Sequence, residues 1–300
     1  MLGTREPSPI PPATVDLTTT DWADTRLPAA WPDGAGPWRA RVRRFVAALA
    51  GAGNTVAVPD DLPGKSWLPT YLLREFHRMP NGYYSASQAR GYERGFEWAM
   101  LGRMREARLR SAARLHGARR ALDIGCGTGR LAGALREAGV ADVVGLDPCP
   151  YLLQVAARRF PSVRFVQGLG EATGFPERMF DAVTACFVFH ELPSTIADRM
   201  LDEIHRVLAP GGLLAITEPS PEQLHPRSLW SLVRRGGLTA LWFRALALLA
   251  REPYIADWHA KQPAAWLARA GFELIEDETE IPFRFLLARK RAPAALSAVS

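Results

Sequence analysis

The sequence predicts an α/β protein in which a mostly parallel, doubly wound sheet is covered by helices on both faces. From residue 119 onwards, short apolar runs alternate with amphipathic helical segments, and this alternation is typical of parallel sheets. In addition, residues 182–189 form an unbroken apolar run, which indicates a central strand that is buried on both faces.

Seven strands and their helices are expected in order after residue 119. The expected strands are 121–124, 143–146, 163–166, 182–189, 213–217, 272–276 and 283–288. The expected helices between them are 129–138, 151–160, 195–208 and 263–270. Residues 220–260 interrupt the alternation with mainly helical sequence, which predicts a helical insertion before the last helix.

The region before residue 119 predicts a different organisation. Residues 1–36 are rich in Pro, Thr, Asp and Gly and lack periodicity, so we expect a disordered tail. Helices are expected over 38–49 and 70–78, and Ser85 is expected to cap a third helix that continues to about Leu115. The predicted domains are therefore a tail (1–36), a helical N-terminal part (37–118) and an α/β domain (119–292).

Composition limits the protein class. The chain is 48% hydrophobic and 23% charged, as expected for a globular enzyme. Three scattered cysteines do not make a disulfide framework, and residues 1–20 lack an apolar run, so we expect a cytoplasmic protein without a secretory signal. The most apolar stretch, residues 238–250, contains Arg244 and is shorter than the roughly 20 residues of a membrane span. It predicts a buried or pocket-lining helix, with a membrane-surface helix as the alternative.

A glycine-rich loop follows the first expected strand. It reads Asp-Ile-Gly-Cys-Gly-Thr-Gly over residues 123–129. Glycine allows backbone to approach a ligand closely, and the helix that follows offers free N–H groups. A dinucleotide fingerprint requires a third glycine where this chain has Arg130, and the Gly-Lys-Ser/Thr of a phosphate-binding loop is absent. Asp147 ends the next strand, where an acidic side chain can accept hydrogen bonds from both ribose hydroxyls.

The pattern Asp-x-Gly-x-Gly-x-Gly, with Asp147 one strand later, resembles motif I of class I S-adenosylmethionine (SAM)-dependent methyltransferases. Phe180-Asp181-Ala-Val, Leu208-Ala-Pro-Gly-Gly-Leu-Leu and the two strands around Pro282 continue the resemblance. It covers about residues 119–290 and is nearest to the branch of ubiquinone- and menaquinone-type methyltransferases. The resemblance implies a Rossmann-like, seven-stranded sheet with an antiparallel C-terminal strand, a helical N-terminal lid over the site, and SAM as cofactor.

The resemblance also implies roles for single residues. The glycine loop would face the methionine and ribose portions of SAM, Asp123 would anchor the amino-acid end, and Asp147 would bind the ribose. The family often has an Asp that reaches the adenine amine, whereas this chain has Leu169. Adenine recognition is then expected from backbone groups, from Glu171 or from apolar packing. The expected cofactor-binding residues are Asp123, Gly125, Cys126, Gly127, Gly129, Asp147, Pro148, Leu169, Gly170 and Glu171.

Methyl transfer from SAM is an in-line displacement that depends mainly on positioning, and it needs a base only when the acceptor must lose a proton. His190 follows the fourth strand and is the candidate base. The alternative, that His190 and Glu191 brace the floor of the pocket, is favoured because displacement often needs no base. No metal site is expected. Candidate substrate contacts are His77, Tyr83, Tyr84, Glu218, Tyr254 and Trp258.

The expected function is methyl transfer from SAM to an O, N or C atom of a small, largely apolar metabolite of quinone-like or natural-product type. The net charge of +6 and the arginine-rich stretch 103–120 leave an RNA methyltransferase as an alternative. The same arginines equally fit the solvated face of a helix, and no aromatic residues interleave with them. A third possibility, suggested by Leu169, is a SAM-fold binder that transfers no methyl group.

Overall fold

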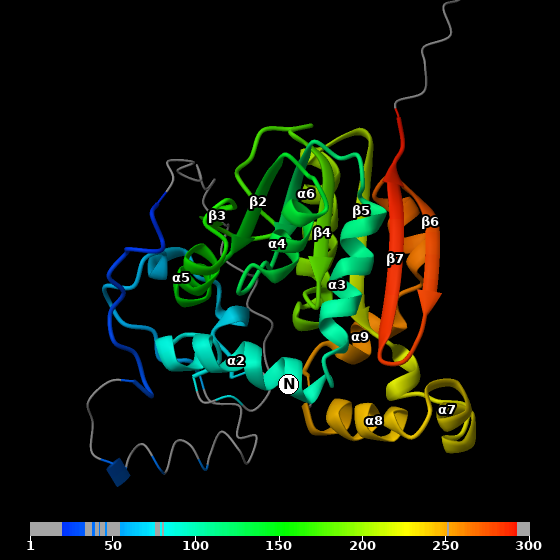
Figure 1. Cartoon of the computed structure of the whole chain (residues 1–300), viewed down its shortest axis with the longest axis horizontal. Helices are drawn as coiled ribbons and strands as arrows, with labels where there is room; N and C mark the ends of the chain where they lie inside the picture. Colours follow the sequence, from blue (N-terminus) through cyan, green and yellow to red (C-terminus); the bar gives the residue numbers. More distant parts are fainter. Residues whose placement is uncertain are drawn as a thin grey trace, which may run out of the picture.

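The computed structural model describes residues 20–33, 38–39, 42, 46, 55–75, 79, 81–250 and 252–292. The strands in these residues are β1 (Arg120–Ile124), β2 (Asp142–Asp147), β3 (Arg164–Gln167), β4 (Phe180–Cys186), β5 (Leu208–Pro219), β6 (Phe272–Thr279) and β7 (Phe283–Lys290). They form one seven-stranded sheet in the spatial order β3-β2-β1-β4-β5-β7-β6 (Figure 1). Every predicted strand is present and overlaps its expected range.

The order of the parallel strands creates a crevice in the middle of the sheet. Strands β1 to β5 pair in parallel, whereas β7 is antiparallel to both β5 and β6. The expected antiparallel C-terminal strand is therefore confirmed. From β1 the chain moves outwards to β2 and β3 and then returns to β4 on the other side of β1. Ligands of open α/β sheets bind at the carboxyl ends of the strands where this reversal occurs.

Alternate residues of each strand pack into separate cores on the two faces of the sheet. On one face, Leu122 and Ile124 of β1 join a cluster with α6 (Ser194–Val207) and α10 (Pro263–Arg269). On the other face, Ala121 joins a cluster with α4 (Arg130–Glu137) and α5 (Pro150–Arg159). Because side chains of a strand alternate with a period of two, both faces of the sheet are apolar and both are covered by helices.

The long helix predicted after Ser85 is two helices. Ser85 caps α2 (Ala86–Ala99) as expected, because its side chain accepts a hydrogen bond from the Gln88 amide. The expected continuation to Leu115 is wrong: Leu101 and Gly102 have positive φ angles of 54° and 74°, which a continuous helix does not allow. The chain then starts α3 (Arg103–Arg114) in a new direction (Figure 1).

Helix α3 packs on the sheet, although it falls in the region expected to form the lid. The hydroxyl of Ser111 on α3 lies 2.8 Å from that of Thr217 on β5, and both are buried. Ala112 and Leu115 join the same cluster as α4. Tertiary packing therefore places α3 in the helical layer that covers the sheet.

Residues 20–33 pack against the α/β domain, so the expectation of a disordered tail is wrong for this segment. Trp22 is buried in the same cluster as Leu153 of α5. The Tyr151 hydroxyl donates to the Pro28 carbonyl and the Arg158 side chain donates to the Ala23 carbonyl, both at 2.8 Å. These partners lie more than 120 residues away in the chain, which is why no local pattern revealed them. The rest of the expected tail lies outside the described residues.

The helix expected over residues 70–78 is wrong for the part of it that the structure describes. Instead of a helix over 70–78, the chain forms the single 3₁₀ turns η1 (Lys65–Trp67) and η2 (Thr70–Leu72), and Arg74 forms a β-bridge with Thr55. Residues 76–78 and most of the helix expected over 38–49 lie outside the described residues.

The predicted helical insertion is confirmed. It contains η4 (Pro221–Gln223), α7 (Leu229–Gly236), α8 (Thr239–Ala250) and α9 (Ile255–Ala260). Figure 1 shows α8 near α2, beyond the edge of the sheet to which the carboxyl ends of the parallel strands point. Among the helices that the structure describes, none has the length and apolar character needed to cross a membrane.

Candidate active site

A cavity opens at the carboxyl ends of β1, β2 and β4, where the strand order reverses. Its empty space, counted out to its open mouth, is about 1270 Å³. Its lining residues come from the glycine loop after β1, the end of β2, η2 and α2. The sheet edge and the N-terminal part therefore enclose one shared site, as the resemblance implied.

Glycine is needed at the three loop positions for different structural reasons, although all three have positive φ angles (64°, 51° and 77°). A Cβ on Gly125 would lie 2.5 Å from Val188, which follows β4. A Cβ on Gly129 would lie 2.7 Å from the Phe165 ring, and Gly129 does not line the cavity. The contact of Gly129 with the cofactor stays a prediction; in the structure this glycine allows α4 to begin close to the sheet. Gly127 borders the cavity itself.

Asp147 holds the glycine loop in place from the end of β2. Its Oδ2 accepts a hydrogen bond from the Gly127 amide at 2.8 Å, and its Oδ1 accepts one from the Cys149 amide at 2.9 Å. Burial raises the pKa of Asp147 to about 6, against the effect of these two amides. A carboxylate oxygen accepts more than one hydrogen bond, so both oxygens keep accepting capacity for a ligand in the cavity.

Asp123 is a buried carboxyl group at the wall of the cavity. Its Oδ1 accepts a hydrogen bond from the Thr184 hydroxyl at 2.7 Å, and its side chain is 1% exposed. Burial raises the pKa of Asp123 to about 7. Its Oδ2 has no hydrogen-bond partner within the described part of the chain, and the same holds for the hydroxyl of Tyr84, another cavity residue. Buried polar atoms of this kind fit a ligand that carries hydrogen-bond donors.

The segment expected at the adenine end lies at the cavity as well. Leu169, Gly170 and Glu171 all line it. A Cβ on Gly170 would lie 2.8 Å from Ile124, so the chain passes close to β1 here. The Tyr71 hydroxyl donates to Oε1 of Glu171 at 2.5 Å. Burial raises the pKa of Glu171 above its ordinary value. Glu171 is thus the acidic group nearest in sequence to the position that Leu169 occupies.

Aromatic side chains of α2 and of the segments next to it form one wall of the cavity. The rings of Tyr83 and Tyr92 lie 4.9 Å apart, Phe96 stacks on Tyr92 at 5.5 Å, and Phe187 meets Phe96 edge-on at 5.6 Å. Glu191 adds one carboxylate to this wall and accepts a hydrogen bond from the Tyr83 hydroxyl at 2.9 Å. This part of the cavity is therefore largely aromatic, with the carboxylate of Glu191 hydrogen-bonded to Tyr83.

His190 lies beside this wall and not in it, so the expectation that it faces the reaction edge is wrong. Strand β4 ends at Cys186, and a 3₁₀ turn, η3 (Phe189–Glu191), turns the ring inwards. The ring is fully buried between two carboxylates, with Nδ1 2.5 Å from Glu218 and Nε2 2.8 Å from Glu252. Burial opposes a charge on the ring, but Glu252 and Glu218 together raise the pKa of His190 well above its ordinary value. The geometry favours the brace over the base.

Three of the expected substrate contacts do not line the cavity, and one lies outside the described residues. The Glu218 carboxylate faces the ring of His190 and the backbone of η3. Trp258 stacks on Phe189 and meets Trp266 edge-on within the core, because the insertion needs apolar side chains to pack on the sheet. Tyr254 is not among the lining residues, and His77 lies outside the described residues. Tyr83 and Tyr84 do line the cavity, as do Cys126 and Pro148.

Several cavity residues were not identified from the sequence. They include Tyr71, Phe96, Arg108 and Phe187. Tyr92 and Phe96 are four residues apart on the helix that Ser85 caps, so their shared face was a readable signal. Tyr71 lies in a short 3₁₀ turn, where no periodic pattern marks the buried face.

Comparison with known proteins agrees with this geometry. A family described as "Methyltransferase domain" matches residues 122–216. The chain is 40% identical over 173 residues to a demethylmenaquinone methyltransferase of Thermus thermophilus, a match that covers 52% of this chain and 75% of that relative. It is 38% identical over 109 residues to an uncharacterized methyltransferase of Synechocystis sp., covering 36% of this chain and about half (49%) of that relative.

A solved structure also matches, at a lower level. An S-adenosylmethionine dependent methyltransferase from Mesorhizobium loti aligns with 60% of this chain and 95% of its own, at 20% identity and a TM-score of 0.45. The family assignment rests on the relative in Thermus thermophilus and agrees with the strand order of this sheet. The chain belongs to the class I SAM-dependent methyltransferases, in their quinone-type branch, and its cofactor is S-adenosylmethionine.

Proposed function

We propose that this enzyme transfers a methyl group from SAM to an O, N or C atom of a small, largely apolar acceptor of quinone-like or natural-product type, as a step in metabolite biosynthesis. The observation that carries the proposal is the aromatic wall of Tyr83, Tyr92, Phe96 and Phe187, which continues the cavity beyond the glycine loop. Pockets lined by aromatic side chains with few polar groups suit such acceptors. The name of the relative in Thermus thermophilus points in the same direction.

The residues at the glycine loop fit the cofactor. SAM supplies a methyl group that its sulfonium charge has already activated. We propose that Asp147 accepts hydrogen bonds from the ribose hydroxyls, since both of its oxygens face donors and retain accepting capacity. Asp123, with its unpartnered Oδ2 within the described residues, suits the cationic amino group. Glu171, held by Tyr71, takes the place of the missing Asp at the adenine end, next to the apolar surface of Leu169.

We propose that Glu191 is the carboxylate that acts as base on the acceptor. An acceptor that must lose a proton before attack needs a base within hydrogen-bonding reach. Glu191 lines the aromatic wall, whereas His190 is enclosed by carboxylates. Tyr83 donates to Oε1 of Glu191, which orients the carboxylate towards one edge of the wall. Burial and the neighbouring Glu191 raise the pKa of Tyr83 well above its ordinary value, so the phenol remains the donor.

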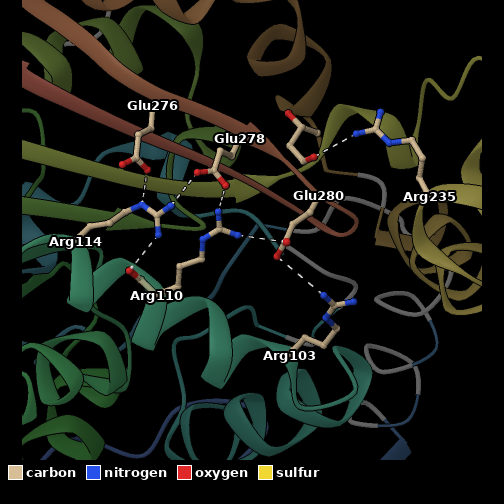
Figure 2. A network of polar contacts seen from close by, with 8 residues as sticks. Arg103, Arg110, Arg114, Arg235, Glu276, Glu278 and Glu280 are labelled. Carbon is tan, nitrogen blue, oxygen red and sulfur yellow. Dashed lines mark hydrogen bonds and ion pairs between the residues drawn. The ribbon is translucent and has the colours of Figure 1, made fainter.

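The arginines of the basic stretch are largely paired within the molecule, which weakens the RNA alternative. Figure 2 shows Arg110 and Arg114 of α3 reaching across to Glu276 and Glu278 of β6. Arg103 and Arg110 face Glu280, Arg108 pairs with Glu97, and Arg120 pairs with Asp142. Cations that are neutralised by nearby carboxylates add little to phosphate binding.

The free thiols of Cys126, Cys149 and Cys186 support a cytoplasmic location.

The test is a product screen with isotopically labelled SAM. The purified enzyme is incubated with an organic extract and, separately, with total RNA from the same cells, and the products are analysed by mass spectrometry. We expect the mass of one labelled methyl group on a compound of the organic extract and no label on RNA. Label on RNA alone overturns the proposed acceptor class. As control, Asp147→Ala should abolish the signal at low SAM concentration in either fraction.

A further inference from the structure

The outward face of α8 is apolar along its whole length. Leu238, just before the helix, is 77% exposed, and Leu248 and Leu249 near its end are 53% and 57% exposed. Leu241 lies about one turn after Leu238, and Trp242 lies about two turns before Leu248 and Leu249. Both are also exposed. Because residues three and four apart share one side of a helix, these side chains form a continuous stripe. The opposite side holds Ala240 and Phe243, which are fully buried.

Neighbouring helices carry further exposed apolar side chains. On α7, Leu229 is 57% and Trp230 is 70% exposed. At the end of α2, Trp98 is exposed and its ring lies 6.1 Å from that of Trp242, whose Nε1 donates to the Ala99 carbonyl at 2.7 Å. We call this surface the α7–α8 face; it consists of Leu229, Trp230, Leu238, Leu241, Trp242, Leu248 and Leu249. Exposed apolar patches of this kind mark an interaction surface.

The charge around the α7–α8 face indicates which kind of partner the face binds. Residues 226–251 contain five arginines and neither Asp nor Glu; of these, Arg235 pairs with Glu222 and Arg244 donates to the Gln223 carbonyl. Arg227 and Arg234 are exposed, and Arg234 lies over the ring of Trp230 at 5.1 Å. Two copies of this face would bring like charges together, which disfavours a homodimer. Tryptophan, leucine and arginine side by side on one surface instead match the headgroup region of an anionic bilayer.

We infer that the α7–α8 face docks on the surface of an anionic phospholipid bilayer. The leucines and tryptophans enter the headgroup region while the arginines contact lipid phosphates, so that α8 lies in the plane of the surface. This agrees with a stripe of about a dozen residues, which is too short to span the roughly 30 Å of hydrocarbon.

Docking in this way brings the cavity to the bilayer. Helix α2 carries Trp98 at its exposed end, and two turns or less away it carries Tyr92 and Phe96 in the cavity wall. Buried Phe243 of α8 shares a cluster with Phe96 and Phe187, so the docking helix also packs behind that wall. The enzyme would therefore receive an apolar acceptor from the bilayer. This last step rests on the proposed function, whereas the docking itself does not.

The test is co-sedimentation of the full chain with vesicles, without any acceptor. We expect binding to vesicles of phosphatidylglycerol and phosphatidylcholine, much weaker binding to phosphatidylcholine alone, and loss of binding at high salt. The variant Trp230→Gln/Leu238→Gln/Leu248→Gln/Leu249→Gln should bind at least about tenfold more weakly. Arg227→Gln/Arg234→Gln should cost roughly fivefold per arginine. The matched control Leu109→Gln/Ile275→Gln replaces exposed apolar residues on α3 and β6 and should bind like the unmodified chain.

The outcomes separate this inference from the proposed function. Equal binding of the α7–α8 variants and the unmodified chain overturns the inference, as does equal binding to neutral and anionic vesicles. If the chain self-associates in sizing columns, and the fourfold variant is a monomer, the face contacts a second copy and the inference is wrong. If the chain does not bind vesicles but methylates a compound in a detergent-dispersed extract, the docking inference is wrong and the proposed function is supported. Circular dichroism and SAM affinity confirm that each variant is folded.

Discussion

Glu218 at the end of β5 holds His190 in the turn that follows β4. Its Oε2 lies 2.5 Å from Nδ1 of the ring, and its Oε1 accepts hydrogen bonds from the amides of Val188 and Phe189 at 2.9 and 2.8 Å. Both side chains are fully buried. One carboxylate therefore fixes the conformation of the turn, and Val188 and Glu191 of that turn line the cavity. On the other side of the ring, Glu252 ties the turn to the helical insertion.

We expect His190→Gln to lower stability strongly while leaving cofactor affinity largely intact. Removing the ring leaves Glu218 and Glu252 buried without their cation, which typically costs about 3–5 kcal/mol. Urea denaturation measures the loss, and calorimetry with S-adenosylhomocysteine measures affinity. Glu222→Gln, which removes an exposed ion pair with Arg235, is the control and should change stability by about 1 kcal/mol or less. Unchanged stability together with lost turnover would instead assign His190 as the base.

The contribution of His190 to stability should depend on pH in a defined direction. Burial opposes its charge, but Glu252 and Glu218 raise the pKa of His190 well above 6.5 in the folded chain. A group whose pKa is raised by folding contributes fully below its unfolded pKa and loses that contribution as pH rises through the folded pKa. The difference in unfolding free energy between the unmodified chain and His190→Gln should therefore be largest near pH 6 and shrink at alkaline pH. A difference that grows with pH contradicts the ion pair.

Asp147→Ala is expected to weaken cofactor binding. The substitution removes the proposed acceptor of the ribose hydroxyls and frees the Gly127 amide, which it normally holds at 2.8 Å. The loss should be about 1.5–3 kcal/mol, or roughly 10- to 150-fold in Kd. Calorimetry with S-adenosylhomocysteine gives this value directly. Asp142→Ala, at the other end of β2 and paired with Arg120, is the matched control. Equal affinity in both variants would refute the ribose assignment.

Cofactor affinity should rise with pH between about pH 6 and pH 8. Burial raises the pKa of Asp123 to about 7 in the free enzyme, so much of it is protonated at pH 6. A cationic amino group favours the ionised form, and binding at low pH must therefore remove a proton from Asp123. One such group gives up to about a tenfold gain in affinity per pH unit below its pKa. Asp123→Asn should flatten the profile, and an unchanged slope in this variant would exclude Asp123 as the source.

Glu191→Gln should reduce turnover more than binding if the acceptor loses a proton during methyl transfer. Loss of a general base typically lowers kcat by about 10²–10⁴-fold, while the KM for SAM should change little because Glu191 lies at the aromatic wall. Tyr83→Phe removes the hydrogen bond to Oε1 and should cause a smaller loss of kcat. In both variants the pH profile of kcat distinguishes the roles, since a residue that only positions the acceptor leaves the shape of the profile unchanged.

The sequence by itself determined where the strands of the α/β region lie along the chain and the location of the cofactor loop. Strands buried on both faces appear as short apolar runs, and a glycine loop between a strand and a helix is a local backbone pattern. Residues 123–129 and Asp147 therefore met at one edge of the sheet as expected, and their link through the Gly127 amide follows from that placement.

Only the tertiary structure decided what long side chains contact. His190 is adjacent to the cavity residue Glu191 in sequence, yet a positive φ of 60° at Phe187 and the 3₁₀ turn after it send its ring away from the cavity. Gly129 belongs to the motif but meets Phe165 of β3, and Trp22 of the expected tail is buried beside α5. These contacts join residues far apart in the chain, and burial depends on which surfaces the fold brings together, a property that no local period encodes.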